Sequence, residues 1–238
     1  MDTPPILEAT KPVLYETGYD EWPYSYAGSC FPVRWGNKLY IVSAFHCYEN
    51  HQLKPEDTLY PIPTGKDDFF SFCFTLRAKI EEAEDSKHYD QVLLEVSTDI
   101  HSEEQLKSVE AIDLSNTESI ITLSDKGIND VWLRGYLSEN PSHEISYDER
   151  KIKQQAYLTN GIVSARQSIF DFCHTLKVKT PTPEGYSPDG MSGSPVYAAD
   201  HQGKIKFAGT IIEFNIYTEE YLVIDSSVIR ELLSRENA

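Results

Sequence analysis

Short apolar segments separated by turn residues dominate the chain. Residues 69–76 (FFSFCFTL) alternate between large apolar side chains and Ser, Cys or Thr. This two-residue period predicts a strand with one face on a core. Comparable strand-like segments are SYAGSCFPVRW and KLYIVSAF before it, and QVLLEVS, VWLRGYL, AYLTNGIVSA, TLKVKT, SPVYAA, KFAGTIIEF and EYLVI after it.

Turn and helix signals divide these strands. Gly36-Asn37 and the Asp200–Gly203 segment have the residues of tight hairpin turns. From Asp225 to Leu233 the apolar spacing changes to that of a short helix, with Asp225 or Ser226 suited to accept its first free N–H groups. The polar stretch 97–120 is the best crossover between two halves. The pattern predicts an all-β fold, a sandwich or barrels, with a short C-terminal helix.

Charge and composition narrow the function classes. The chain has 38 acidic and 21 basic residues, a net charge of −17, which repels a phosphate backbone and argues against nucleic-acid binding. No apolar run approaches the roughly 18 residues of a membrane span, and no secretory signal is legible. Cytoplasmic residence with free thiols is therefore expected. The cysteines are Cys30, Cys47, Cys73 and Cys173, and the acidic run 81–85 is expected to be a solvated loop.

Three short motifs carry candidate chemistry. Ile41–Cys47 (IVSAFHC) places His46 at a strand end, Asp90 directly precedes the apolar QVLLEV, and Ser192 stands in the glycine-flanked turn DGMSGSP. Taken alone, each motif also fits a packed histidine, a turn aspartate or a plain loop. Together they supply a hydroxyl nucleophile, an imidazole base to activate it and a carboxylate to orient the imidazole.

The order of the three residues selects among known arrangements. The chain runs His, Asp, Ser, whereas α/β-hydrolases run Ser, Asp, His and subtilisins run Asp, His, Ser. The α/β-hydrolase elbow also needs glycine two residues after the nucleophile, where this chain has Ser194. Both folds are therefore disfavoured.

The motifs resemble those of the chymotrypsin/trypsin-like serine peptidases. SAFHC is similar to that family's Thr/Ser-Ala-Ala-His-Cys, DQVLL to Asp-Ile-Ala-Leu-Leu, and GMSGSP to Gly-Asp-Ser-Gly-Gly-Pro. LTNGIVSA and the opening GSCF are closer to the bacterial HtrA-type branch, although its PDZ recognition modules are not expected here. The resemblance implies two six-stranded antiparallel β-barrels, with residues 1–105 forming the first, 106–120 a linker, and 121–238 the second barrel and terminal helix.

The resemblance also implies roles for the site residues. Ser192 would attack the scissile carbonyl, His46 would act as general base and then acid, and Asp90 would orient His46. Backbone N–H groups of Gly190 and Ser192 would form the oxyanion hole, in which one donor is worth about 3 kcal/mol. No cofactor or metal is implied, and the substrate would be a polypeptide.

Departures from the family pattern concern activation and specificity. Met191 stands where trypsin-type enzymes have an aspartate that pairs with a new N-terminal amine, so activation by that ion pair is not expected. Phe214 and Tyr186 are expected to narrow the substrate pocket, and Glu213 is a further substrate-binding candidate.

Cys30 and Cys47 lie where extracellular relatives carry a disulfide. Because no export signal is legible, reduced thiols are the favoured interpretation.

Three other interpretations stay open beside an active, cytoplasmic serine endopeptidase. One is a catalytically inactive binding module with the protease fold. Another is a peptidase that is latent until a regulatory protein partner orders the oxyanion loop. A zinc site is the weakest interpretation, because no second pair of candidate ligands stands at the short sequence spacing that zinc sites use. Its candidate ligands are His46, Cys47, His51, Cys73 and Cys173-His174.

Overall fold

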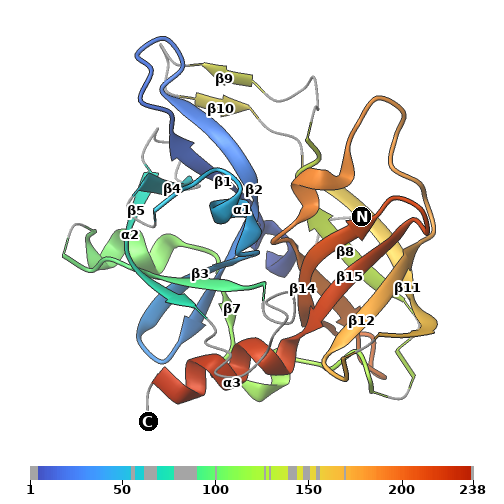
Figure 1. The fold of residues 1–238 in the computed structure, drawn as a ribbon. Coiled ribbons are helices and arrows are strands. Elements are labelled where there is room, and N and C mark those ends of the chain that lie inside the picture. The colour runs from blue at the N-terminus through green and yellow to red at the C-terminus, as the bar shows by residue number, and fades with distance from the viewer. Residues whose placement is uncertain are drawn as a thin grey trace.

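Two β-sheet halves lie side by side, with a C-terminal helix across their lower side (Figure 1). The structure is a computed structural model that describes residues 5–54, 57–61, 69–77, 90–99, 101–125, 127–128, 130–138, 144–146, 151–153, 156–168 and 170–236. In this part of the chain, no helix is long and apolar enough to cross a membrane.

The first half is one curled, seven-stranded sheet in the order β1-β4-β5-β6-β3-β2-β7. Its first strand pairs with both β4 and β2, so the sheet bends back on itself. The strands are β1 (Lys11–Glu16), β2 (Tyr24–Trp35), β3 (Lys38–Ser43), β4 (Thr58–Pro61), β5 (Phe69–Arg77), β6 (Val92–Val96) and β7 (Ile112–Asp113). The helices in this half are the 3₁₀ helix η1 (Pro5–Ala9), α1 (His46–Glu49) and α2 (Glu103–Ser108).

The second half is a closed antiparallel barrel in the order β11-β12-β15-β14-β13-β8. Its strands are β8 (Val131–Gly135), β11 (Tyr157–Gln167), β12 (Cys173–Val178), β13 (Pro195–Ala199), β14 (Ile205–Asn215) and β15 (Glu220–Asp225). The remaining elements are the hairpin of β9 (Glu144–Ser146) and β10 (Lys151–Lys153), the 3₁₀ helices η4 (Thr117–Ser119) and η5 (Pro188–Met191), and α3 (Ser226–Glu236).

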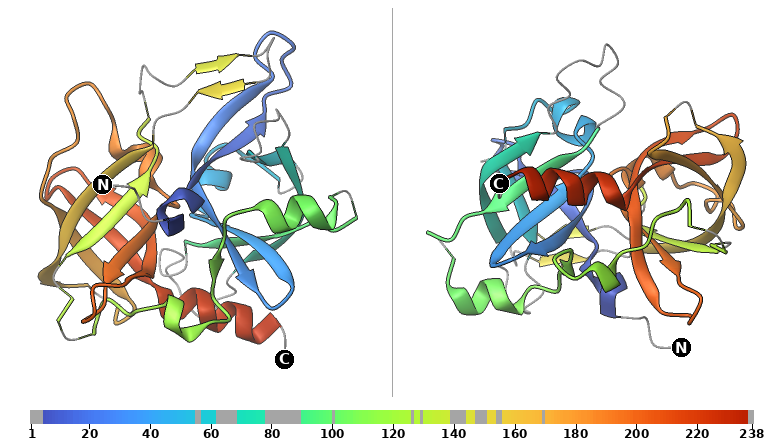
Figure 2. Two further views of the ribbon diagram at one scale, coloured as in Figure 1. Left: turned by 180° about the vertical axis from the view of Figure 1, so that it is seen from behind. Right: turned by 90° about the horizontal axis from the view of Figure 1, so that it is seen from below.

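A shared apolar core joins the halves. It combines buried residues of the first sheet with Tyr197 and Phe207 of the barrel, Leu7 of η1, and Ile229 and Leu233 of α3. Figure 2 shows η1, in dark blue, between the halves and α3 crossing from one to the other. Both terminal segments therefore help to fix one half against the other, and with it the site between them.

Most of the predicted strands and both predicted hairpins are confirmed. Gly36 turns the β2–β3 hairpin with a φ of 61°, which glycine adopts without a steric penalty. The terminal helix is also confirmed, and the Asp225 carboxylate accepts the Ser227 N–H at 3.0 Å as its cap. Residues 69–76 lie within strand β5, but their side chains and the acidic run 81–85 lie outside the described residues.

The two-barrel expectation is confirmed only in part. The fold is mostly β, with one closed six-stranded barrel and a curled half-barrel to which a parallel seventh strand, β7, is added. The crossover region contains the helix α2, which the polar composition of 97–120 did not reveal. Its Ser102 and Gln105 form a reciprocal capping box, so capping residues rather than an apolar face define this helix.

Candidate active site

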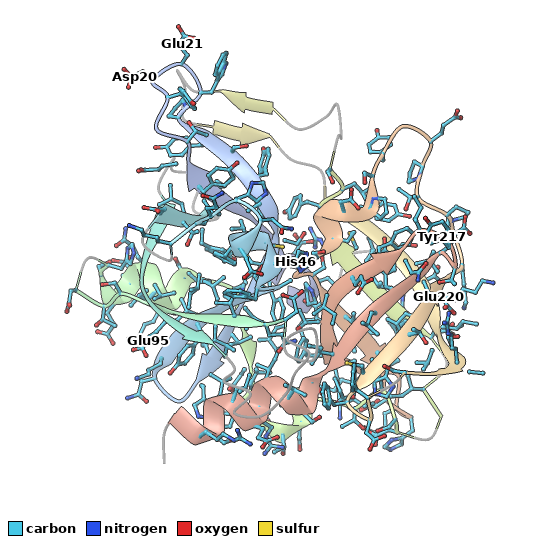
Figure 3. All side chains as sticks on the ribbon, viewed as in Figure 1. Asp20, Glu21, His46, Glu95, Tyr217 and Glu220 are labelled. Atoms are coloured by element: carbon cyan, nitrogen blue, oxygen red, sulfur yellow. The ribbon has the colours of Figure 1, made fainter. Side chains whose placement is uncertain are left out.

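His46 lies at the junction of the two halves (Figure 3), and its side chain is hydrogen-bonded to Asp90. Nδ1 of His46 is hydrogen-bonded to Oδ2 of Asp90, and the His46 backbone N–H donates to Oδ1 at 2.7 Å. The Phe45 N–H donates to the Asp90 backbone carbonyl at 3.2 Å. The carboxylate therefore holds both the ring and the main chain of His46, which fixes the direction in which the imidazole points.

Strand pairing explains why these two residues meet. Strands β3 and β6 are antiparallel neighbours, and Ser43 at the end of β3 is paired with Val92 at the start of β6. His46 follows β3 by one short turn and Asp90 precedes β6 by two residues, so both leave the sheet at the same edge. His46 begins α1 rather than ending a strand, as the sequence had suggested.

The second ring nitrogen of His46 faces a thiol. Its Nε2 lies 3.9 Å from the Cys47 sulfur, and that sulfur lies 3.7 Å from the Ser192 carbonyl oxygen. Burial alone lowers the pKa of His46, but hydrogen bonding to Asp90 and the neighbouring Cys47 outweigh this effect and raise the pKa from 6.5 to about 10. The imidazole is therefore cationic at neutral pH in this arrangement.

Ser192 lies in a tight turn between η5 and β13. The Gly193 N–H donates to the Ile211 carbonyl of β14 at 2.8 Å, and Gly193 has a φ of 84°. A Cβ on Gly193 would lie 2.0 Å from the Ser29 carbonyl oxygen, so the turn requires glycine for both conformation and space. Met191 is fully buried in the barrel core, which anchors the turn through apolar contacts.

Ser29 of β2 ties this turn to the first half. Its N–H donates to the Ser192 carbonyl at 2.9 Å, and its hydroxyl donates to the Gly190 carbonyl at 2.7 Å. These bonds bring Ser192 beside Cys47 and His46. The Ser192 hydroxyl itself makes no hydrogen bond to any described residue, and Ser192 keeps 8 % of its surface exposed. The three predicted residues are therefore gathered in one place, with only His46 and Asp90 directly bonded.

The amides expected to form the oxyanion hole are engaged inside the turn. The Ser192 N–H is directed at the Asp189 carbonyl, 3.5 Å away, at the end of η5. In a 3₁₀ helix each N–H points back toward the carbonyl three residues earlier, so the N–H of Gly190 also points along η5. An oxyanion would need both amides directed into the cleft. In this structure the Ser192 N–H is directed at the Asp189 carbonyl instead, so it is not available to an oxyanion.

The three predicted substrate-binding residues differ in their surroundings. Phe214 packs on Tyr221 with ring centroids 4.8 Å apart, and both contact the barrel core that holds Met191. Tyr186 packs against the same core and is half-buried. Glu213 is exposed, because the strand register shifts between Ile211 and Glu213.

The described cysteines are reduced in the structure, which agrees with the interpretation favoured from the sequence, and Cys30 and Cys47 share one core cluster without a disulfide. Cys30, Cys47 and Cys173 are free and buried, and the Cys30 thiol contacts the Pro12 carbonyl at 3.6 Å. Gly28 also lies against Cys47, because a Cβ on Gly28 would be 2.6 Å from the Cys47 sulfur.

The residues proposed for zinc are dispersed. His51 contacts the Tyr15 hydroxyl at 3.4 Å, while His174 pairs with Asp225 in the barrel at 3.4 Å. The side chain of Cys73 lies outside the described residues. Within the described ranges, no group of three or more His, Cys, Asp or Glu side chains could hold a metal ion.

Sequence reasoning missed two residues at this site. Ser29 was identified only as part of a motif, and Cys47 only as part of a motif and as a candidate for a disulfide or a zinc site. Nothing in the local sequence marks Ser29, because its bonds reach residues more than a hundred positions away. Cys47 could have been noticed from its position directly after His46.

Comparison with known proteins supports the fold. No family model matches the chain, and no curated protein matches its sequence. Among solved structures, a thermostable serine protease from an extremophilic microorganism superimposes with a TM-score of 0.59 at 11 % identity, covering 98 % of both chains. This match does not single out the HtrA-type branch. The chain therefore has a chymotrypsin-like serine-protease fold over nearly its whole length.

Proposed function

We propose that this protein is a serine endopeptidase that is latent in the conformation described here. The observation that carries the proposal is the His46–Asp90 pair beside the turn that presents Ser192, at the junction of the two halves of a protease fold. A hydroxyl, an imidazole and an orienting carboxylate are the groups that acyl transfer requires. Polypeptides are the proposed substrates.

The proposed chemistry follows from the position of each group. Neutral His46 takes the Ser192 proton through Nε2 while Ser192 Oγ attacks the scissile carbonyl, and Asp90 stabilises the imidazolium that forms. The imidazolium then protonates the leaving amine, which leaves an acyl-enzyme for water to hydrolyse. Catalytic hydrogen bonds are often long before substrate binds and shorten in the complex, which is consistent with an unbonded Ser192 hydroxyl.

Latency is supported by the engaged amides. Rotation of the Asp189–Gly190 peptide would remove the Asp189 carbonyl from the Ser192 N–H and direct the Gly190 N–H into the cleft. We propose that a substrate or a regulatory protein partner drives this rotation. The free thiols of Cys30, Cys47 and Cys173 favour a reducing compartment, so we place the protein in the cytoplasm.

We propose that two rings packed against the core that anchors the nucleophile turn set the specificity. Phe214 and Tyr186 would limit the side chain accepted at the cleavage position to a small one, because both rings pack toward the core beneath Met191. Glu213 faces solvent and would meet only substrate residues at the rim.

A fluorophosphonate probe tests the proposal. We expect Ser192 of the folded protein to be labelled slowly, and faster after a lysate supplies an activator, whereas heat-denatured protein and Ser192→Ala should not be labelled. Ser192→Ala should keep the fold, because Ser192 is held through its carbonyl rather than its hydroxyl. Absence of labelling under every condition would instead identify a non-catalytic binding module.

A further inference from the structure

We infer that Ser29 is a positioning residue that confines the rearrangement of the nucleophile turn to one peptide group, Asp189–Gly190. The inference rests on the proposed function, whose oxyanion amides this peptide controls. Ser29 is fully buried on β2, in the half of the molecule opposite the turn.

Ser29 holds the turn at two carbonyls. Its hydroxyl donates to the Gly190 carbonyl at 2.7 Å, and its backbone N–H donates to the Ser192 carbonyl at 2.9 Å. These two carbonyls lie on either side of Met191, whose side chain is fixed in the barrel core. The Gly190–Met191 and Ser192–Gly193 peptide planes are therefore both restrained by a single residue.

Ser29 is itself fixed by both halves. Its hydroxyl accepts the Tyr136 N–H from the end of β8 at 3.0 Å, and its carbonyl accepts the Ser43 hydroxyl from β3 at 2.7 Å. The hydroxyl thus acts as donor and acceptor at once, which sets the direction of its proton toward Gly190. A buried hydroxyl satisfied in this way has little freedom to release the Gly190 carbonyl.

The restraint leaves one peptide free to turn. Rotating Asp189–Gly190 changes ψ of Asp189 and φ of Gly190, and it moves neither carbonyl that Ser29 holds. Glycine at position 190 permits the new φ, and a Cβ there would lie 2.3 Å from the Tyr136 carbonyl oxygen. Activation would therefore redirect the Gly190 N–H and release the Ser192 N–H from the Asp189 carbonyl, while Ser192 keeps its place beside Cys47 and His46.

The test compares Ser29→Ala with Ser226→Ala. Ser29→Ala removes the hydroxyl and keeps the N–H bond to Ser192. Ser226→Ala removes one buried hydroxyl bond of 2.9 Å, to the Ile121 carbonyl, away from the site. Fluorophosphonate labelling gives the maximal labelling rate constant, the probe affinity and the labelled fraction separately. Hydrogen exchange of residues 187–194 gives a second readout that needs no activity.

We expect Ser29→Ala to lower the maximal labelling rate constant by about 10- to 100-fold, with probe affinity and labelled fraction unchanged. A merely structural role would reduce the labelled fraction instead. Exchange of residues 187–194 should be about tenfold faster or more in Ser29→Ala, and unchanged in Ser226→Ala. Equal rate constants and equal exchange in both variants would overturn the inference.

The two proposals fail separately. If the wild-type protein is never labelled, the proposed function fails, and the exchange comparison alone decides on Ser29. If the wild-type protein is labelled and Ser29→Ala behaves like wild type in both readouts, the inference fails while the function stands. Should Ser29→Ala not fold, Ser29→Cys replaces a strong side-chain donor by a weak one, and we expect an intermediate rate constant and intermediate exchange. Wild-type values of both would show that the strength of this hydrogen bond does not matter, which overturns the inference.

Discussion

The sulfur of Cys47 lies 3.9 Å from Nε2 of His46, on the ring edge away from Asp90. The imidazole is therefore held between a carboxylate and a polarizable thiol, and its pKa is raised to about 10. A general base must be neutral to accept a proton, so this environment sets the pH range in which Ser192 can react.

Cys47→Ala should make labelling of Ser192 possible at lower pH. Labelling of the wild-type protein should rise with pH up to about 10, as His46 loses its proton. Removing the sulfur removes one of the effects that raise this pKa, so the midpoint of the pH–rate profile should fall. Cys173→Ala is the control, because Cys173 is a buried thiol in the closed barrel. It should leave the midpoint unchanged. An unchanged midpoint in Cys47→Ala would show that the thiol does not influence His46.

Gly193→Ala should destabilise the protein by about 3 kcal/mol or more, through a positive φ and steric overlap together. The added Cβ would lie 2.0 Å from the Ser29 carbonyl oxygen and 2.4 Å from the Ser43 hydroxyl. Gly203→Ala is a matched control, because Gly203 has a similar φ of 79° with no heavy atom within 4 Å of the added Cβ. It should cost only about 1–2 kcal/mol. Chemical denaturation of both variants measures the difference, and equal losses would contradict the close packing.

Asp225 should make stability depend on acid pH. Burial raises the pKa of this carboxyl, but His174 and the N–H and hydroxyl groups around it outweigh burial and hold the pKa below its ordinary 3.8. The stabilisation is therefore complete above pH 3.8 and is lost as pH falls through the lower folded value. Asp225→Asn should lower the free energy of unfolding by about 2 kcal/mol at pH 7. It should also weaken the loss of stability at acid pH. Asp130→Asn, an exposed partner of Lys179, should change stability by less than about 0.5 kcal/mol. A wild-type acid slope in Asp225→Asn would contradict this assignment.

Leu7→Ala should cost about 3 kcal/mol, as expected for a leucine removed from a core. Leu7 is 4 % exposed and belongs to the apolar core between the two halves. Leu158→Ala, at a position that is 45 % exposed on β11, should cost about 0.5 kcal/mol or less. Thermal unfolding of both variants tests whether η1 is part of the core, and a negligible loss for Leu7→Ala would show that it is not.

Phe214→Ala should broaden the cleavage preference toward large apolar residues, because removing the ring that packs on Tyr221 opens space against the core that anchors the nucleophile turn. Glu213→Ala, the exposed neighbour, should leave this preference unchanged. Mass-spectrometric mapping of cuts in a denatured proteome measures the preference. An identical set of cuts from Phe214→Ala and wild type would exclude Phe214 as a determinant of specificity.

The sequence predicted those elements whose signals lie within a few neighbouring residues. The apolar runs of β3 and β14, the Gly36 turn and the Asp225 cap are each visible within a few residues of sequence, and the structure contains them all. By contrast, β1 and β7 went unnoticed, because β7 has only two residues and β1 owes its strand geometry to pairing with β2 and β4.

The site was predictable as a set of residue types but not as a geometry. The chemistry of His46, Asp90 and Ser192 suggested that they belong together. The direction of the Gly190 N–H, by contrast, depends on ψ of Asp189 and φ of Gly190 in η5, and a glycine at 190 permits more than one arrangement of these angles. The roles of Ser29 and Cys47 depend on contacts across the junction, which only the folded chain creates.

The burial of α3 has a consequence for synthesis on the ribosome. Ile229 and Leu233 cover apolar side chains of β2 and β3 that emerge almost two hundred residues earlier. A nascent chain that has not yet released residues 226–236 leaves that surface open to chaperones, and it cannot lock its halves together. The two halves would thus be held together only after residues 226–236 have left the ribosome.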